Sequence, residues 1–310
     1  MKTAFLFPGQ GAQAVGMGAE IVREFPAAAQ VFERANDIVG YDLQDICIEG
    51  PAEQLNSTTV SQPAIFATSA ALLEVLRTES TKDQIIPDVT AGLSLGEYTA
   101  LYAAGLLSLE DGLTLVQKRG QAMQAAADAT EGAMVSIIGL DEERVRRLCE
   151  EAGEGDILKP VNFNCPGQIV VSGDRKACRI AKELAIKCGA IKAVRLEVAG
   201  AFHTQMMSSA ADALAEALAG CEIAEPAQTQ VIANINAEYY PSSEKIREGL
   251  VKQLTSPILW QKCMERLLAD GVEAFYEIGP GRVLTGLMRR IHRKTRVNNL
   301  SSLQTVRELL

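Results

Sequence analysis

One serine lies in a sequence context that is typical of a nucleophile. Residues 92–96 read Gly-Leu-Ser-Leu-Gly, a G-x-S-x-G pattern between an expected strand at 88–93 and an expected helix at 97–104. In that context the glycines allow a sharp turn, and the hydroxyl group of Ser94 projects above the sheet. The main-chain N–H group of Leu95 and the positive end of the helix favour negative charge at the same place. We expect Ser94 to attack a carbonyl group, although the pattern, which also arises by chance, does not identify that group.

A serine hydroxyl group needs a base to take its proton, and the chain has only two histidines. His292 lies among arginine and lysine side chains in the run 290–294. Their positive charges disfavour the protonated imidazole that a base must become. His203 follows an expected strand at 193–198 and is by elimination the predicted general base. Five aspartates lie between Ser94 and His203, but none ends an expected sheet strand, so a main-chain carbonyl group that orients His203 remains an alternative to a triad. These aspartates are Asp111, Asp128, Asp141, Asp156 and Asp174.

A second glycine-rich loop follows the first expected strand, at 2–7. Residues 9–14 fit G-x-G-x-x-A, the pattern of a dinucleotide-binding turn. The acid that should end a second strand about 20 residues later is missing, because 27–37 has the pattern of a helix. The same loop suits a second oxyanion donor, with Gln10 at the obvious position. A nucleotide-binding protein without catalytic activity therefore remains an alternative.

The order of the expected elements indicates an α/β fold with two parts. Strands and helices alternate on both sides of an insert, which predicts a parallel sheet in a hydrolase-like large subdomain made of residues 1–128 and 199–310. Residues 129–198 follow the order β-α-β-β-α-β, which predicts a ferredoxin-like small subdomain. The other expected strands are at 134–138, 158–164, 168–172, 230–234 and 274–278. The other expected helices are at 21–39, 64–76, 113–127, 142–151, 175–188, 206–218, 244–254 and 261–270.

Composition excludes several classes of protein. The 310 residues carry a net charge of −9, which argues against a nucleic-acid binder that recognises no sequence. Seven scattered cysteines without a C-x-x-C pair indicate a reducing compartment, and a zinc site is not expected. No apolar run is long enough for a membrane span, and Pro8 ends the N-terminal apolar run too early for a secretory signal. We therefore expect a cytoplasmic protein.

Six spaced motifs are similar to those of one family, the malonyl-CoA:acyl-carrier-protein transacylases of bacterial fatty acid synthesis. The resemblance covers nearly the whole chain, in the right order. It implies that Ser94 is acylated, that His203 is its base, and that Gln10 and Leu95 donate main-chain N–H groups to the oxyanion. One departure is Leu93, where the family usually has histidine. Any fine tuning of the site that this histidine gives in the family is therefore in doubt for this chain. The motifs are residues 7–11, 62–64, 92–97, 117–120, 200–203 and 279–281.

The resemblance also implies roles for residues around the serine. Arg119 matches the arginine that binds the malonyl carboxylate, a task that suits a planar, permanently charged, bidentate group. Gln253 matches the position whose main-chain carbonyl group orients the histidine. Phe202 resembles the pattern of malonyl-selective domains, in which its bulk crowds an α-methyl group. The remaining matches are Gln62 and Met123 in the acyl pocket and Asn162 facing the cleft.

The implied reaction is a ping-pong transfer of malonyl from malonyl-CoA to the pantetheine thiol of an acyl carrier protein. It needs no metal or cofactor, and we expect a monomer with neither nucleic acid nor membrane as partner. Carrier proteins are acidic, so Lys118 and a C-terminal basic run are candidates for the docking face, although the run also has the pattern of a solvated helix end. A thioesterase or esterase remains an alternative, and Arg119 distinguishes the two because a hydrolase of neutral acyl chains does not need it. The basic run comprises Arg289, Arg290, His292, Arg293, Lys294 and Arg296.

Overall fold

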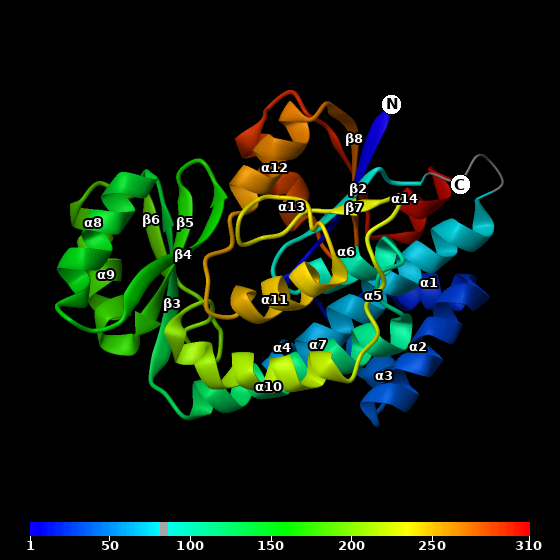
Figure 1. Ribbon diagram of the computed structural model, residues 1–310, viewed down its shortest axis with the longest axis horizontal. Coiled ribbons are helices and arrows are strands. Elements are labelled where there is room, and N and C mark those ends of the chain that lie inside the picture. Colours follow the sequence, from blue (N-terminus) through cyan, green and yellow to red (C-terminus); the bar gives the residue numbers. More distant parts are fainter. Residues whose placement is uncertain (81–85) are drawn as a thin grey trace.

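The computed structural model describes residues 1–80 and 86–310, and it contains two separate sheets (Figure 1). The larger part is built on a five-stranded parallel sheet in the order β7-β2-β1-β8-β9. Phe5 and Phe7 of β1 pack into one hydrophobic core and Ala4 and Leu6 into another, so the sheet is buried on both faces, as in α/β proteins. The predicted fold class is confirmed. The strands are β1 (Lys2–Phe7), β2 (Val89–Gly92), β7 (Gln230–Val231), β8 (Val272–Ile278) and β9 (Val297–Leu300).

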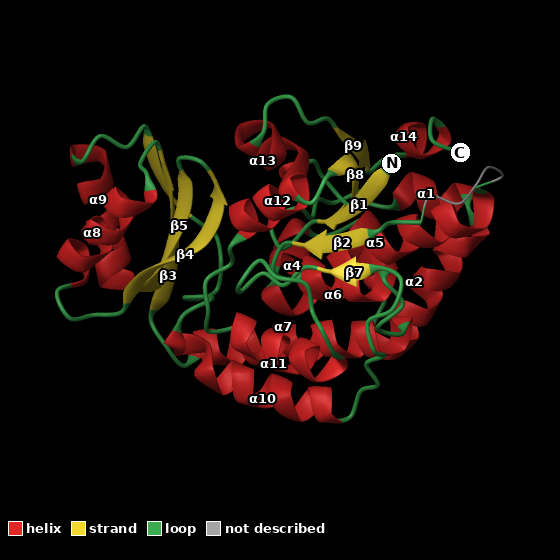
Figure 2. Cartoon of the chain, turned by 45° about the horizontal axis from the view of Figure 1, so that its top comes forward, coloured by secondary structure: helices red, strands yellow, loops and turns green. Residues whose placement is uncertain are grey.

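The second sheet is antiparallel and has the order β4-β5-β3-β6. With α8 and α9 it forms the β-α-β-β-α-β unit that the sequence predicts, seen at one end of the molecule in Figure 2. Alternate residues of β3, such as Val135 and Ile137, pack against the two helices, whereas Met134 and Ser136 face the large subdomain across a cavity. The boundaries at 128/129 and 198/199 stay a prediction. The elements are β3 (Gly132–Ile138), α8 (Glu142–Gly153), β4 (Leu158–Cys165), β5 (Gln168–Asp174), α9 (Arg175–Lys187) and β6 (Lys192–Arg195).

The helices of the large subdomain cover both faces of the parallel sheet (Figure 2). Helices on the N-terminal side pack around α5 and α7, and α12 and α13 cover the opposite face. The first group comprises α1 (Ala19–Glu24), α2 (Pro26–Val39), α3 (Leu43–Ile48), α4 (Ala52–Asn56), α5 (Thr58–Glu79), α6 (Gly96–Ala103) and α7 (Leu109–Asp128). The later ones are the 3₁₀ turn η1 (Gln205–Met207), α10 (Ser208–Ala219), α11 (Ser243–Gln253), α12 (Trp260–Ala269), α13 (Val283–Ile291) and α14 (Leu303–Arg307).

Several element boundaries differ from the sequence prediction, two of them at prolines. The single helix expected at 21–39 is two helices, because Pro26 forces the preceding residue, Phe25, into an extended conformation. The helix expected at 64–76 already begins at Thr58, so Pro63 lies inside it, where the loss of one backbone hydrogen bond does not end the helix. The strand expected at 230–234 has only two residues. The elements α3, α4, α14 and β9 were not expected, and of α13 only its solvated end was expected, because these elements are short or lie in segments with mixed patterns.

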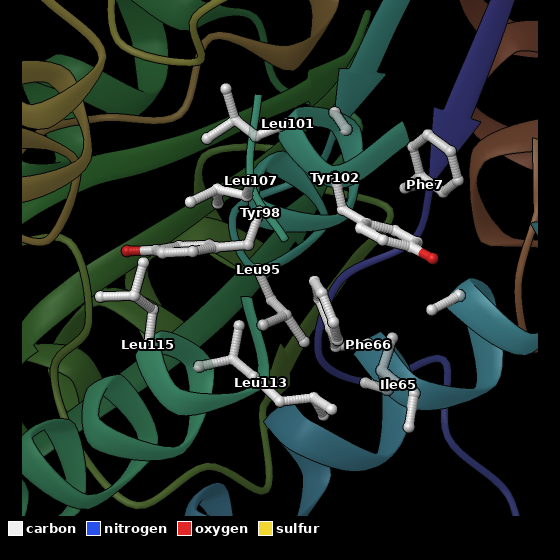
Figure 3. Close-up of a cluster of buried hydrophobic side chains, with 14 of the residues drawn as sticks. Phe7, Ile65, Phe66, Leu95, Tyr98, Leu101, Tyr102, Leu107, Leu113 and Leu115 are labelled. Atoms are coloured by element: carbon white, nitrogen blue, oxygen red, sulfur yellow. The ribbon is translucent and has the colours of Figure 1, made fainter. Parts of the chain in front are cut away.

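The helix that follows the G-x-S-x-G turn is held in the middle of a hydrophobic core. Figure 3 shows Leu95, Tyr98 and Leu101 of this segment among the side chains of α5 and α7, including Phe66 and Leu113. All of α6 is buried. Closely packed interiors allow little movement, so this packing fixes where α6 begins. The start of α6 is the turn that carries Ser94.

Helix α5 is long and apolar enough to cross a membrane by length and composition alone, the one such helix within 1–80 and 86–310. Most of its side chains are buried in the protein, and the helix packs against α2 and α7. A helix that is apolar on all sides is typical of the centre of a large core. The burial of α5 therefore gives no indication of a membrane protein.

Candidate active site

The turn around Ser94 depends on two glycines that leave no room for a side chain. A Cβ atom at Gly92 would lie 1.9 Å from the main chain of Gly96, and one at Gly96 would lie 2.2 Å from the main-chain oxygen of Phe7. Ser94 itself has a φ of 52°, which is unusual for a residue other than glycine. Such backbone strain persists only where the surroundings enforce it, and it is concentrated at functional sites. The turn holds Ser94 at the carboxyl end of β2, between β1 and α6.

His203 lies directly beside this serine. Its Nε2 atom is 3.0 Å from Ser94 Oγ, and its Nδ1 atom is 2.8 Å from the main-chain oxygen of Gln253. A carbonyl oxygen accepts only, so Nδ1 carries the proton and Nε2 is free to accept one from the serine. His203 has a φ of 63°, so both partners of the pair have left-handed backbone. The geometry is a dyad oriented by a carbonyl group, and none of the five candidate aspartates bonds to His203 within the described chain.

The surroundings of His203 keep its ring neutral. Burial, followed by the nearby Arg119 guanidinium, lowers the pKa of His203 to about 4, although the hydrogen bond to Gln253 opposes this shift. A neutral imidazole is the form that can accept a proton. His292, by contrast, is exposed, and its Nδ1 atom lies 2.7 Å from Thr295 Oγ1. The structure therefore places only one of the two histidines at the serine.

Arg119 reaches the serine from α7, and only 1% of its surface is exposed. Its guanidinium group donates to Gln62 Oε1 at 2.7 Å, to Ser94 Oγ at 3.0 Å and to Gln253 Oε1 at 3.0 Å. Its Nε atom has no hydrogen-bond partner within the described residues, and the group lies over the Tyr98 ring at 5.5 Å. Burial lowers the pKa of Arg119 from its usual value. A buried cation whose direct partners are neutral is prepared to bind an anion.

A cavity of about 480 Å³ opens between the two subdomains in front of these residues. Four of the remaining predicted residues line it together with the reactive groups. Gln62 does not, because it lies behind Arg119 and its Nε2 atom is 3.4 Å from Met123 Sδ. Leu95 and Gln253 also lie behind the cavity wall, and Leu93 supplies an apolar surface where the resembling family has histidine. The four predicted lining residues are Gln10, Met123, Asn162 and Phe202.

Two buried side chains beside the serine were missed by the sequence analysis. Asn234 accepts a hydrogen bond from the Ser94 N–H group at 2.7 Å and donates to the Gly92 oxygen at 2.7 Å, so it clamps the turn. Glu97, the residue after the G-x-S-x-G pattern, bonds to Gln253. Asn234 ends the segment in which a strand was expected, and the carboxyl ends of parallel strands are where α/β sites form. That rule would have found Asn234.

The geometry gives little support to a dinucleotide-binding site or to a metal site. The dinucleotide pattern needs a helix directly after the loop, but the chain after β1 makes turns until α1 begins at Ala19. Gly9 instead brings this loop against the turn, since a Cβ atom there would lie 2.2 Å from the Leu93 oxygen. Within the described part of the chain, no three His, Cys, Asp or Glu side chains are grouped as metal ligands. The arrangement suits acyl transfer by a serine.

The fold and the serine–histidine–arginine arrangement define a class of enzymes that move acyl groups. Consistent with this, residues 4–308 match the model of the acyl transferase domain. The malonyl CoA-acyl carrier protein transacylase of Bacillus subtilis is 43% identical over 98% of this chain and 95% of its own length. The chain belongs to the family of malonyl CoA-acyl carrier protein transacylases, and it is an acyltransferase.

Solved structures agree with this assignment. An acyl carrier protein S-malonyltransferase from Vibrio cholerae superposes with a TM-score of 0.93 at 41% identity, and the match covers all of both chains. A malonyl transacylase in complex with a type II polyketide acyl carrier protein gives a TM-score of 0.95 at 40% identity, covering 100% of this chain and 99% of that one. Both likenesses extend over the two subdomains, and they support the predicted architecture.

Proposed function

We propose that the chain transfers malonyl from malonyl-CoA to the pantetheine thiol of an acyl carrier protein through a malonyl ester on Ser94. In the first half-reaction His203 Nε2 takes the serine proton while Oγ attacks the thioester carbonyl carbon. The C–S bond then breaks, and the proton passes from His203 to the departing CoA sulfur. In the second half-reaction His203 takes the carrier thiol proton and the sulfur attacks the ester carbonyl carbon. The bond between that carbon and Ser94 Oγ then breaks, and the proton passes from His203 to Oγ. This sequence is a ping-pong transfer.

The observation that carries the proposal is the contact of one serine hydroxyl group with both a neutral base and a buried cation. Ser94 Oγ lies 3.0 Å from His203 Nε2 and 3.0 Å from an Arg119 nitrogen. The base activates the oxygen, and the cation lies where the carboxylate of a short dicarboxylic half-ester on that oxygen would end. Arginine suits this task because it can bind a carboxylate through two parallel hydrogen bonds. A neutral acyl chain would leave the Arg119 charge without a partner.

The same geometry supports main-chain stabilisation of the tetrahedral oxyanion. The N–H groups of Ser94, Gly96 and Glu97 already donate to Asn234, Leu93 and Ser94 respectively. Leu95 therefore supplies the N–H group of the turn that remains for a substrate oxygen, and it lies at the positive end of α6. We assign the second donor to Gln10, which lines the cavity on the other side of Ser94. Met123, Phe202 and Asn162 then form the walls around the acyl group.

We further propose that the acidic carrier protein docks on basic side chains of α13 and the segment after it. Arg289 and Arg293 are exposed there, on a groove of about 820 Å³. Arg290 has another role, because it donates to Gln168 Oε1 at 2.7 Å and thereby joins α13 to the small subdomain. Lys118 is exposed on α7 but is not part of the groove. The groove continues with Arg282, Lys294 and Arg296.

The proposed reaction requires no metal ion or redox cofactor. A thioester is already activated toward attack, no electrons are transferred, and main-chain N–H groups with Arg119 supply the electrostatic stabilisation. We also propose that the protein acts as a cytoplasmic monomer, since one chain supplies every group of the site described above. Malonyl-CoA and the carrier protein are then its only reactants.

Intact mass spectrometry after brief mixing with malonyl-CoA tests the proposal. We expect a gain of one malonyl group, which peptide mapping places on Ser94 and which disappears when the holo carrier protein is added. Ser94→Ala should show no gain, whereas Ser61→Ala, which removes another buried serine, should label normally. Labelling of another residue, or no labelling of a folded protein, would overturn the proposed mechanism.

A further inference from the structure

Glu97 is a fully buried carboxylate that the proposed mechanism does not use. Its Oε1 atom accepts a hydrogen bond from the Tyr240 hydroxyl group at 2.6 Å, and its Oε2 atom accepts one from Gln253 Nε2 at 2.6 Å. A buried carboxylate is costly unless its oxygens are hydrogen-bonded, and here both are. Neither partner touches the cavity. Any effect of Glu97 on the reaction must therefore pass through another residue.

Gln253 is that residue, because it contacts all three groups of the site. Its main-chain oxygen orients His203, at 2.8 Å from Nδ1. Its side-chain Oε1 atom accepts from Arg119 at 3.0 Å, and its Nε2 atom donates to the main-chain oxygen of Ser94 at 3.0 Å. The orientation of this one amide group decides whether Arg119 faces an acceptor or a donor.

An amide side chain can turn over and exchange its oxygen and nitrogen, whereas an ionised carboxylate only accepts hydrogen bonds. The carboxylate of Glu97 and the main-chain oxygen of Ser94 therefore both hold the NH₂ group of Gln253 on their side, and the oxygen of the amide faces Arg119. We propose that Glu97 is a positioning residue that fixes the amide of Gln253 and through it aims the Arg119 guanidinium group at the malonyl carboxylate. The inference rests on the proposed function, since it assigns to Glu97 part of the selectivity for malonyl.

Protonation of Glu97 should weaken this control, because a carboxylic acid also donates. Burial raises the pKa of Glu97 to about 7, against the opposing hydrogen bonds from Tyr240 and Gln253 and the charge of Arg119. The titratable groups around it are Arg119 from α7, Tyr98 from its own helix, Tyr240 from the segment before α11, and Cys263 from α12. Burial raises the pKa of Tyr98, Tyr240 and Cys263, and Arg119 stays charged. Glu97 is thus the group of this set that titrates near neutrality.

The test compares the rates of malonyl and acetyl transfer from CoA to free pantetheine. A merely structural role would lower both rates together, whereas loss of Arg119 positioning lowers the malonyl rate alone. For Glu97→Gln, which can turn either amide face toward Gln253, we expect the malonyl-to-acetyl ratio of kcat/KM to fall about fivefold or more. Glu277→Gln is the matched control. That carboxylate is also fully buried, but it caps α13 through the N–H groups of Leu284 and Thr285, so its removal should leave the ratio unchanged.

The outcomes separate the inference from the proposed function. A wild-type enzyme without preference for malonyl would overturn the proposed function itself. A wild-type preference that Glu97→Gln retains in full would overturn only the positioning role. If Glu97→Gln does not fold, the test is the malonyl-to-acetyl ratio of kcat/KM of the wild type, measured between about pH 8 and pH 6. This ratio should fall toward pH 6 as Glu97 takes up its proton. A ratio that stays constant over that range would then refute the inference.

Discussion

Two arginine-containing regions of this chain both carry positive charge but differ in burial and in hydrogen bonding. Arg119 is buried at the active site, where its three hydrogen bonds go to Gln62, Ser94 and Gln253. Arg289 and Arg293 are exposed on the groove of α13. A buried charge interacts strongly with an anion at short range, but its burial is costly without one. An exposed charge acts weakly at contact and is screened by salt, yet it attracts partners before they touch.

This difference suggests a division of labour between acyl-group choice and carrier choice. A malonyl group differs from a neutral acyl group by one small carboxylate, and a buried, oriented arginine distinguishes these two groups best. A carrier protein presents many acidic groups over a wide surface, and several solvated cations can attract it without a fixed geometry. The two regions can therefore be disrupted separately, and the first should affect the choice of acyl group whereas the second should affect only the use of the carrier protein.

The largest effect should follow from Arg119→Ala. Removing a buried cation that pairs with the substrate carboxylate should reduce malonyl transfer by about a hundredfold or more, whereas acetyl transfer should fall much less. Steady-state kinetics with both acyl-CoA substrates and pantetheine as acceptor measure the two rates. Arg119→Lys should restore only part of the loss, because an ammonium group cannot form the paired hydrogen bonds. A variant that still strongly prefers malonyl would exclude the carboxylate role and return the serine hydrolase to consideration.

The surface region should give a smaller effect that depends on salt. Reversing both exposed charges, in Arg289→Glu/Arg293→Glu, should raise the KM for the carrier protein about tenfold at low ionic strength and less at high salt. Transfer to free pantetheine should not change, because that acceptor carries none of the acidic surface. Lys118→Glu, on a different helix, is the comparison that locates the docking face. Unchanged carrier kinetics in the double variant would remove α13 from the interface.

The fold was largely predictable because its signals are local. The alternation of strand and helix patterns, and the β-α-β-β-α-β order of the insert, follow from hydrophobic periodicity and turn residues. Short elements such as α3 and β9 were missed because so few residues show no clear period. The sequence could not show that Pro26 divides one helix while Pro63 lies within another, since the outcome depends on the packing around each proline.

A site residue could be predicted where its own type and spacing indicate its chemistry. It could not be predicted where its role depends on hydrogen bonds to other residues. Ser94 stands out by its turn and His203 by the scarcity of histidines, whereas Arg119 could be selected among the arginines only by family resemblance. Asn234 has only the weak signal of its place at the end of an expected strand, and Glu97 has none of its own, because the importance of both lies in hydrogen bonds to residues more than 130 positions away in the sequence. Contacts of that kind exist only in the folded chain.

The smallest predicted effect concerns stability, and it distinguishes two buried groups of the site, His203 and Glu97, whose pKa values lie between about 4 and 7. Folding lowers the pKa of His203 from 6.5 to about 4, so between these values the unfolded chain binds more protons there and stability rises with pH. Folding raises the pKa of Glu97 from 4.5 to about 7, so over nearly the same range the folded chain binds more protons there and stability falls as pH rises. The two contributions oppose each other in the wild type.

Single substitutions should reveal each contribution. Between about pH 4.5 and 6.5, urea unfolding of Glu97→Gln should show a free energy of unfolding that rises more steeply with pH than in the wild type, by at most about 1.4 kcal/mol per pH unit. His203→Gln should change the slope in the opposite direction. Equal slopes in all three proteins would show that neither group is held in the unusual protonation state that burial imposes. The neutral state of His203 that a base requires would then find no support in the stability measurement. Opposite slopes would show that the folded site holds a neutral imidazole and a protonated carboxyl group over the same pH range.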